Sequence, residues 1–104
     1  MSSVEESVRA FMKEGALQAT AWLRVMSNEH RLLVLCLLLE HGEMTVGRLN
    51  EYVGLSQSAL SQHLAKLRGE GLVAFRREAQ SLHYRIANPE VATLIAALKK
   101  IFCP

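Results

Sequence analysis

Apolar residues recur every three or four positions from Val4 to Met26. This spacing places them on one face of an amphipathic helix of about 20 residues. After Ser27 and Asn28, which both offer N-cap side chains, residues 32–39 are apolar without interruption. A helix that is apolar on every side is buried on most of its faces, so this segment is expected to form the centre of the core. Gly42 follows where a left-handed residue could end the helix.

Two shorter helices are predicted next, over residues 45–53 and 56–68, with Gly54 between them. Tyr52 is expected to point inward together with the apolar residues of the first of these helices. The buried stripe of the second helix consists of Leu60, Leu64 and Leu67. Two short helices joined by a tight turn form a helix-turn-helix unit.

Alternating apolar and polar residues then predict two strands, over residues 72–77 and 82–86, joined by a polar hairpin tip. The tip has no Asn-Gly signal, so its turn type stays open. The pair at residues 88–89, Asn followed by Pro, opens a last helix with an apolar stripe. The sequence therefore predicts a mainly α domain over residues 1–104, with five helices and a two-stranded hairpin in the order α-α-α-α-β-β-α.

Composition narrows the class of protein. The chain has 104 residues, about half of them hydrophobic, and a net charge of +2 with no aspartate. The longest apolar run, residues 32–39, is shorter than the roughly 18 residues that a membrane span needs. Glu5 and Glu6 stand where a signal peptide would carry basic and apolar residues. We therefore expect a cytoplasmic protein that does not bind membranes.

The charge is unevenly distributed. Residues 1–54 contain five basic and seven acidic side chains, whereas residues 55–87 contain five basic and two acidic ones. A polyanion would meet the second segment first, because its field acts locally. An ordinary solvated face is the alternative, since the excess of three charges is modest.

The helix over residues 56–68 has a surface suited to reading DNA. Its exposed side is rich in Ser and Gln and has no acidic residue, whereas ordinary solvated helices usually carry Glu and Lys. Such side chains both donate and accept hydrogen bonds, as base edges in the major groove do. Arg76 and Arg77 near the hairpin tip would lie against the DNA backbone or the minor groove. The candidate DNA-binding residues are Ser56, Gln57, Ser58, Ser61, Gln62, His63, Lys66, Arg76 and Arg77.

The block Leu55-Ser-Gln-Ser-Ala-Leu-Ser-Gln-His-Leu-Ala-Lys-Leu-Arg68, followed by Gly71-Leu-Val73, resembles the winged helix-turn-helix of the ArsR family of bacterial repressors. Residues 26–32 resemble the family's entry to its second helix. The resemblance covers nearly the whole chain and implies a homodimeric repressor of double-stranded operator DNA, dimerised through its first and last helices. The dimer residues implied by the two apolar stripes are Val8, Phe11, Leu94, Leu98 and Ile101.

Cys36 and Cys103 lie 67 positions apart, without a CxxC or a Cys-His cluster. A structural metal or another cofactor is therefore not expected, nor is a permanent disulfide in a cytoplasmic protein. The residues alone favour two unrelated thiols. Cys36 would fill space in a core helix, and Cys103 would be a terminal thiol.

The family resemblance changes this interpretation. Residues 44–53 contain no Cys, and residues 88–104 contain no His and one acid, so the metal sites of the family's metal sensors are missing. One Cys in the second helix and one in the ending Phe102-Cys103-Pro104 resemble the sulfide- and persulfide-responsive branch, of the BigR, SqrR and HlyU kind. That branch implies a dithiol switch in which reactive sulfur or an oxidant bridges Cys36 and Cys103 and releases DNA.

Three alternatives remain. The chain could be an ArsR-type repressor with another inducer, such as arsenite or none, or a winged-helix module that binds protein. An enzyme is the third, but the four His residues are scattered and no Asp exists, so no general acid–base pair is formed.

Overall fold

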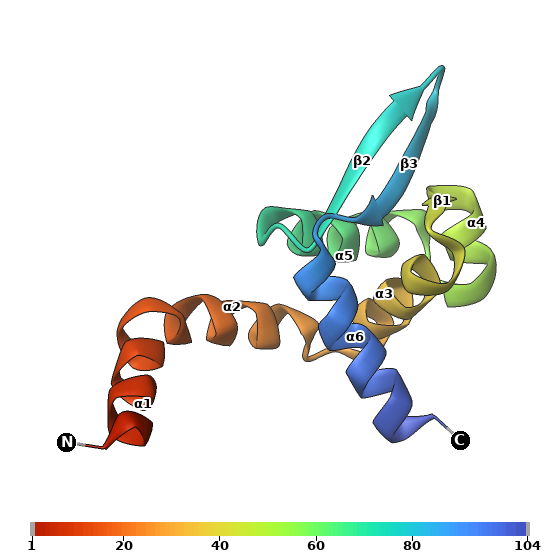
Figure 1. Ribbon diagram of the computed structural model, residues 1–104. Helices are drawn as coiled ribbons and strands as arrows, with labels where there is room; N and C mark the ends of the chain where they lie inside the picture. The colour runs from red at the N-terminus through yellow and green to blue at the C-terminus, as the bar shows by residue number, and fades with distance from the viewer. Residues whose placement is uncertain (1, 104) are drawn as a thin grey trace.

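The computed structural model describes residues 2–103, and it confirms a mainly helical winged helix-turn-helix (Figure 1). Met1 and Pro104 lie outside the described residues, so the Pro104 part of the C-terminal motif is not placed. Over the described range the elements are α1 Ser3–Glu14, α2 Ala16–Met26, α3 Glu29–His41, β1 Glu43–Thr45, α4 Val46–Val53, α5 Gln57–Gly69, β2 Val73–Glu78, β3 Ser81–Ile86 and α6 Pro89–Phe102.

The prediction of one long N-terminal helix was wrong, because the chain bends at Gly15 and forms two helices. Gly15 has φ −126° and ψ −23°, outside helical geometry, and its N–H donates to the carbonyl of Phe11. Glycine weakens a helix because it has the largest backbone freedom to lose. Helix α1 consequently points away from the rest of the molecule (Figure 1) and has no buried residue. The domain therefore has six helices rather than five.

Helix α3 forms the centre of the core, as its apolar run predicts. Val34, Leu35, Leu37 and Leu38 are all buried. The Oδ1 of Asn28 caps the helix by accepting from two backbone N–H groups, which satisfies donors that the first turn leaves open. The remaining core residues come from seven other elements and the turn before β2: Met26, Met44, Leu49, Leu60, Leu64, Leu67, Leu72, Val73, Tyr84, Val91 and Ile95.

A third strand, β1, was not predicted. It pairs antiparallel with β3, so the sheet has the order β1-β3-β2. Three residues are too few for an alternating pattern to be recognised, and pairing rather than local preference makes this strand. Met44 of β1 lies opposite Tyr84 of β3, and both are buried. The base of the wing is thereby attached to the core.

Tyr52 does not point inward as expected. Its side chain is 49% exposed and lies beside His41, with ring centroids 5.8 Å apart, and beneath the guanidinium of Arg48. Within residues 2–103, no helix has the length and apolar character needed to span a bilayer.

The hairpin tip contains a strained residue. Ala79, the first of the two residues between β2 and β3, has φ +56°. Replacing Ala79 with glycine is expected to raise the free energy of unfolding by about 0.5–1 kcal/mol, because a residue with a Cβ is strained at positive φ. Urea unfolding followed by circular dichroism measures the change. Gln80 has no positive φ, so Gln80→Gly is the matched control and should give no gain. Equal stability of Ala79→Gly and wild type would contradict the strain.

Candidate nucleic-acid interface and cysteine pair

Helices α4 and α5 are joined by a turn that side chains hold at both ends. Gly54 ends α4 in the left-handed conformation, with φ +69°. The side-chain amide of Asn50 donates to the carbonyl of Leu55 at 2.8 Å and accepts from its N–H at 3.0 Å. Ser56 then caps α5 by accepting from the N–H of Ala59. The role of Asn50 in holding this turn was not predicted, although a side-chain amide five residues before Leu55 was visible in the sequence.

Helix α5 separates an apolar side from a polar side as predicted. Leu60, Leu64 and Leu67 are buried. The exposed residues on the opposite side are Gln57, Ser58, Ser61, Gln62 and Lys66. Ser56 is also exposed, but its hydroxyl oxygen serves as the helix cap. Residues 57–69 form a helix without any acidic side chain, so its exposed side does not repel a polyanion.

The polar side of α5 and the hairpin tip face a common hollow of about 290 Å³. Gln57 and Ser61 contribute from α5, and Gln80 and Ser81 contribute from the tip. The hollow is also lined by Val46, Gly47 and Leu82. Sequence reasoning missed the two tip residues, because only the fold shows that the tip reaches the helix. A polar tip beside a Ser- and Gln-rich helix can present donors and acceptors to one duplex from two sides.

Arg68 fixes the wing relative to α5. Its Nη1 donates to the hydroxyl of Tyr84 on β3 at 2.8 Å, and its guanidinium lies 5.3 Å from the ring centre of Phe75 on β2. The end of α5 is therefore attached to both strands of the wing. This contact positions the two polar surfaces without itself facing the hollow.

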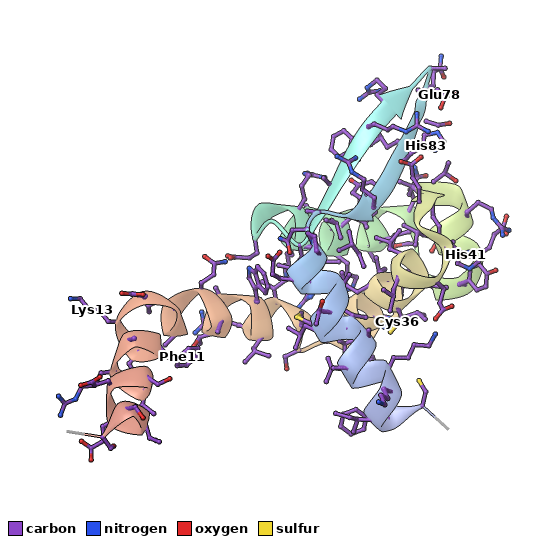
Figure 2. The ribbon with its side chains drawn as sticks, in the orientation of Figure 1. Phe11, Lys13, Cys36, His41, Glu78 and His83 are labelled. Carbon is purple, nitrogen blue, oxygen red and sulfur yellow. The ribbon has the colours of Figure 1, made fainter. Side chains whose placement is uncertain are left out.

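The two predicted wing arginines differ in their surroundings. Arg76 Nε donates to both carboxylate oxygens of Glu43, at 3.0 and 3.2 Å, and its Nη1 donates to Glu78 at 2.7 Å. These hydrogen bonds lower the pKa of both carboxyl groups and raise the pKa of Arg76. His83 lies 3.8 Å from each of the two carboxylates (Figure 2). Two carboxylates thus offset the charge that Arg76 could offer to DNA.

Arg77 points to the other face of the hairpin, because successive residues of a strand alternate. It lies opposite Leu82 in the register, and Leu82 is part of the hollow shared with α5. Among residues 2–103, no carboxylate is paired with Arg77 by an ion pair or hydrogen bond. Arg77 is accordingly the better placed of the two for a phosphate contact.

His63 does not lie with the polar side of α5. Its Nδ1 is 3.2 Å from Nη1 of Arg31, at the start of α3, and its ring centre is 5.7 Å from that of His30. Burial is the first cause that lowers the pKa of His63, and the charge of Arg31 adds to it. The ring is directed toward α3 rather than toward the hollow.

Cys36 on α3 and Cys103 at the end of α6 line the same apolar hollow, which has a volume of about 240 Å³. Leu32, Leu98, Lys99 and Phe102 complete its wall. Figure 2 shows Cys36 on the α3 segment that α6 crosses. Both thiols are free, Cys36 half-buried and Cys103 exposed. The fold thus brings two cysteines 67 positions apart to one site, although they are not bonded.

The charges around this cysteine hollow act on Cys36. Burial raises the pKa of Cys36, the neighbouring Cys103 raises it further, and the ammonium of Lys99 lowers it. Lys99 also forms an ion pair with Glu40, which connects α6 to α3 beside the thiols. Cys36 and Glu40 are one turn apart on α3 and share a helix face, and the N–H of Cys103, the C-cap of α6, donates to the carbonyl of Lys99. Within the described chain, no group of three His, Cys or Glu residues could hold a metal ion.

The predicted dimer residues divide into two sets. Val8, Phe11 and Ile101 are 57%, 55% and 70% exposed. Leu94 and Leu98 pack half-buried against the chain's own core. Phe11 lies on the arm formed by α1, away from the wing (Figure 2).

The family model described as bacterial regulatory protein, arsR family, matches residues 28–74. The chain is 46% identical over 92 residues to the transcriptional activator HlyU of Vibrio cholerae serotype O1, covering 88% of this chain and 84% of the relative. It is 36% identical over 102 residues to the biofilm growth-associated repressor of Xylella fastidiosa strain Temecula1, covering 98% and 89%.

Solved structures agree with this relationship. HlyU from Vibrio cholerae N16961 superposes with a TM-score of 0.84 at 45% identity, covering 88% of this chain and 98% of that one. The transcriptional repressor BigR from Xylella fastidiosa gives a TM-score of 0.82 at 38% identity, covering 92% and 97%. The protein therefore belongs to the arsR family, whose members are DNA-binding transcriptional regulators and not enzymes.

Proposed function

We propose that the protein is a homodimeric repressor that leaves its operator when reactive sulfur species or oxidants bridge Cys36 and Cys103. The observation that carries the proposal is the single apolar hollow lined by both thiols. One related protein is named a repressor and another an activator, so repression itself is part of the proposal.

The DNA-binding surface combines the polar side of α5 with the wing. Gln57, Ser58, Ser61 and Gln62 read base edges in the major groove, since their amides and hydroxyls match its pattern of donors and acceptors. Phosphate contacts come from Lys66 and Arg77, with Ser56 at the helix start. Arg76 contributes less, because Glu43 and Glu78 offset its charge. The tip residues Gln80 and Ser81 join this surface because they share the hollow with α5.

The sulfur chemistry proceeds in two displacements. The Cys103 thiolate attacks the terminal sulfur of a persulfide, RSSH, and displaces RS⁻, which takes up a proton to give RSH. The Cys36 thiolate then attacks the inner sulfur of Cys103–SSH, releases HS⁻ and closes a disulfide. The two thiols lose two electrons, and RSSH is reduced to RSH and H₂S. A second persulfide reacting before closure leaves extra sulfur in the bridge.

The environments of the two thiols support this order. Cys103 is exposed and meets the persulfide first, whereas burial raises the pKa of Cys36 and keeps more of it protonated. Lys99 opposes that effect at close range. Cys36 therefore acts as the resolving thiol.

The bridge reaches DNA through the packing of the helices. Helix α3 contacts α6 at the cysteine hollow and also contacts α5. A covalent bond between α3 and the end of α6 changes how the exposed end of α6 meets a second protomer, and with it the spacing of the two α5 helices. Differential stabilisation of two dimer states by a few kcal/mol is enough for about 100-fold in affinity.

Mass spectrometry of the treated protein tests the switch directly. After a persulfide donor, we expect a cross-linked pair of peptides containing Cys36 and Cys103, with or without additional sulfur masses, within one protomer. Parallel samples receive peroxide or arsenite, because an arsenite adduct on unlinked thiols would identify another inducer. A donor that modifies Cys103 alone and never links it to Cys36 would refute the dithiol mechanism.

The homodimer is proposed to form through α1 and the end of α6. Phe11→Glu is expected to convert the dimer to a monomer in sedimentation experiments and to weaken operator binding, because a buried carboxylate without a partner opposes association. Lys13→Glu, an exposed change on the same helix, is the matched control. A Phe11→Glu protein that sediments as a dimer would place the interface elsewhere.

A further inference from the structure

One guanidinium connects the α2–α3 junction to α5. The Nε of Arg31 donates to the carbonyl of Val25, in the last turn of α2, at 2.6 Å. Its Nη1 lies 3.2 Å from Nδ1 of His63 on α5. The backbone N–H of Arg31 donates in turn to the cap residue Asn28. Three helices therefore meet at the side chain of Arg31.

This contact selects one tautomer of His63 and disfavours its protonation. Arginine has only donors, so Nδ1 of His63 must accept, and the single ring proton of the neutral imidazole then sits on Nε2. The groups whose charges act on the ring are Arg31 and His30 on α3 and Lys66 on α5. All three are cationic or can become so. A proton added to Nδ1 would replace an accepted hydrogen bond with repulsion between two cations.

We propose that Arg31 and His63 are positioning residues, which hold α5 in its DNA-binding orientation against the α2–α3 junction only while His63 is neutral. The proposal rests on the proposed DNA-binding function and assigns His63 a role different from the direct DNA contact expected from sequence. Arg31 bonds to the last turn of α2, the helix that follows α1. The orientation of α5 is therefore set from the side of the molecule that carries α1.

The two roles of His63 predict opposite pH dependence. A phosphate contact strengthens as His63 gains a proton, so affinity would rise as the pH falls. A positioning contact is lost on protonation, so affinity falls. The surroundings hold the pKa of His63 below its ordinary value. The neutral form therefore stabilises the fold fully above about pH 6.5, and this stabilisation is lost as the pH falls through the folded-state pKa.

The experiment compares operator affinity from pH 7.5 to 5.5 for wild type and His63→Asn, using a duplex selected by the wild-type protein from random sequences. Asparagine offers Oδ1 to Arg31 and does not titrate. We expect near-equal affinity at pH 7.5 and a several-fold lower affinity of the wild type than of His63→Asn at pH 5.5, because only the wild type gains a proton at this position as the pH falls. His63→Lys should bind weakly throughout, because it mimics the protonated state.

His41→Asn is the matched control, since His41 is an exposed histidine on α3 in contact with Tyr52 rather than Arg31. It should keep the wild-type pH profile. Circular dichroism at each pH establishes that the variants are folded, and ¹⁵N shifts of the His63 ring report the Nε2–H tautomer. A wild-type affinity that rises or stays level relative to His63→Asn overturns the positioning role alone. A wild-type protein that selects no duplex overturns the proposed function and this inference together.

Discussion

Replacing Ser61 with glutamate is expected to lower operator affinity by about 100-fold or more. Ser61 is exposed on the polar side of α5 and lines the hollow shared with the wing tip. In the proposed complex a carboxylate there would face base edges and phosphates, and a single lost base contact costs about 1–3 kcal/mol. In the proposed homodimer this loss would occur in both protomers. Fluorescence anisotropy with the selected duplex at fixed ionic strength measures it.

Thr93→Glu provides the matched control for Ser61→Glu. It adds the same charge and a similar side chain at an exposed site on α6, so its affinity should stay within a few-fold of wild type. If Ser61→Glu binds the duplex as well as Thr93→Glu does, α5 is not the reading element. A winged-helix module that binds protein would then be favoured.

Cys36→Ser is expected to keep its operator affinity in the presence of a persulfide donor, whereas the wild-type protein loses about 100-fold in affinity. Without Cys36, a persulfide on Cys103 has no partner thiol and cannot close a bridge. The measurement is operator affinity before and after the donor, followed by reduction to recover binding.

Cys36→Ala separates the chemistry from effects on packing, because Cys36 is half-buried among apolar residues and a serine hydroxyl would lack a partner there. Both variants and Cys103→Ser should remain bound. The reagent control is the plain thiol RSH that corresponds to the persulfide donor, because this thiol has no sulfur to transfer. Release of DNA from Cys36→Ala by the donor would show that bridging is not the signal.

Local signals in the sequence were sufficient for most of the fold. Asn28, Ser56 and Asn88 were each assigned as helix starts, and each side chain caps its helix in the structure. A cap depends on backbone groups two or three residues away, so the sequence contains all of the information. Gly15 was harder to interpret, because its position fits the helical spacing and only the backbone geometry reveals the break.

Features that depend on distant segments could not be predicted in this way. Strand β1 exists through its pairing with β3, some 40 residues later. The ion pair of Arg76 with Glu43 spans 33 positions, and it depends on the strand order. The residues alone favoured two unrelated cysteines, and only the resemblance indicated a pair. Their shared hollow is produced by the packing of α3 against α6.

The arm formed by α1 has a consequence for how the protein responds to dilution. It is a twelve-residue helix with no buried residue, and isolated helices of this length are marginally stable in water. Packing against another surface is therefore needed to keep α1 helical. If that surface belongs to a second copy of the protein, the arm unwinds when the subunits separate. Its backbone amides then exchange with solvent, and the unwound segment becomes sensitive to proteases. A lower cellular concentration of the regulator would then raise its monomeric fraction, and these monomers would be degraded before the dimers.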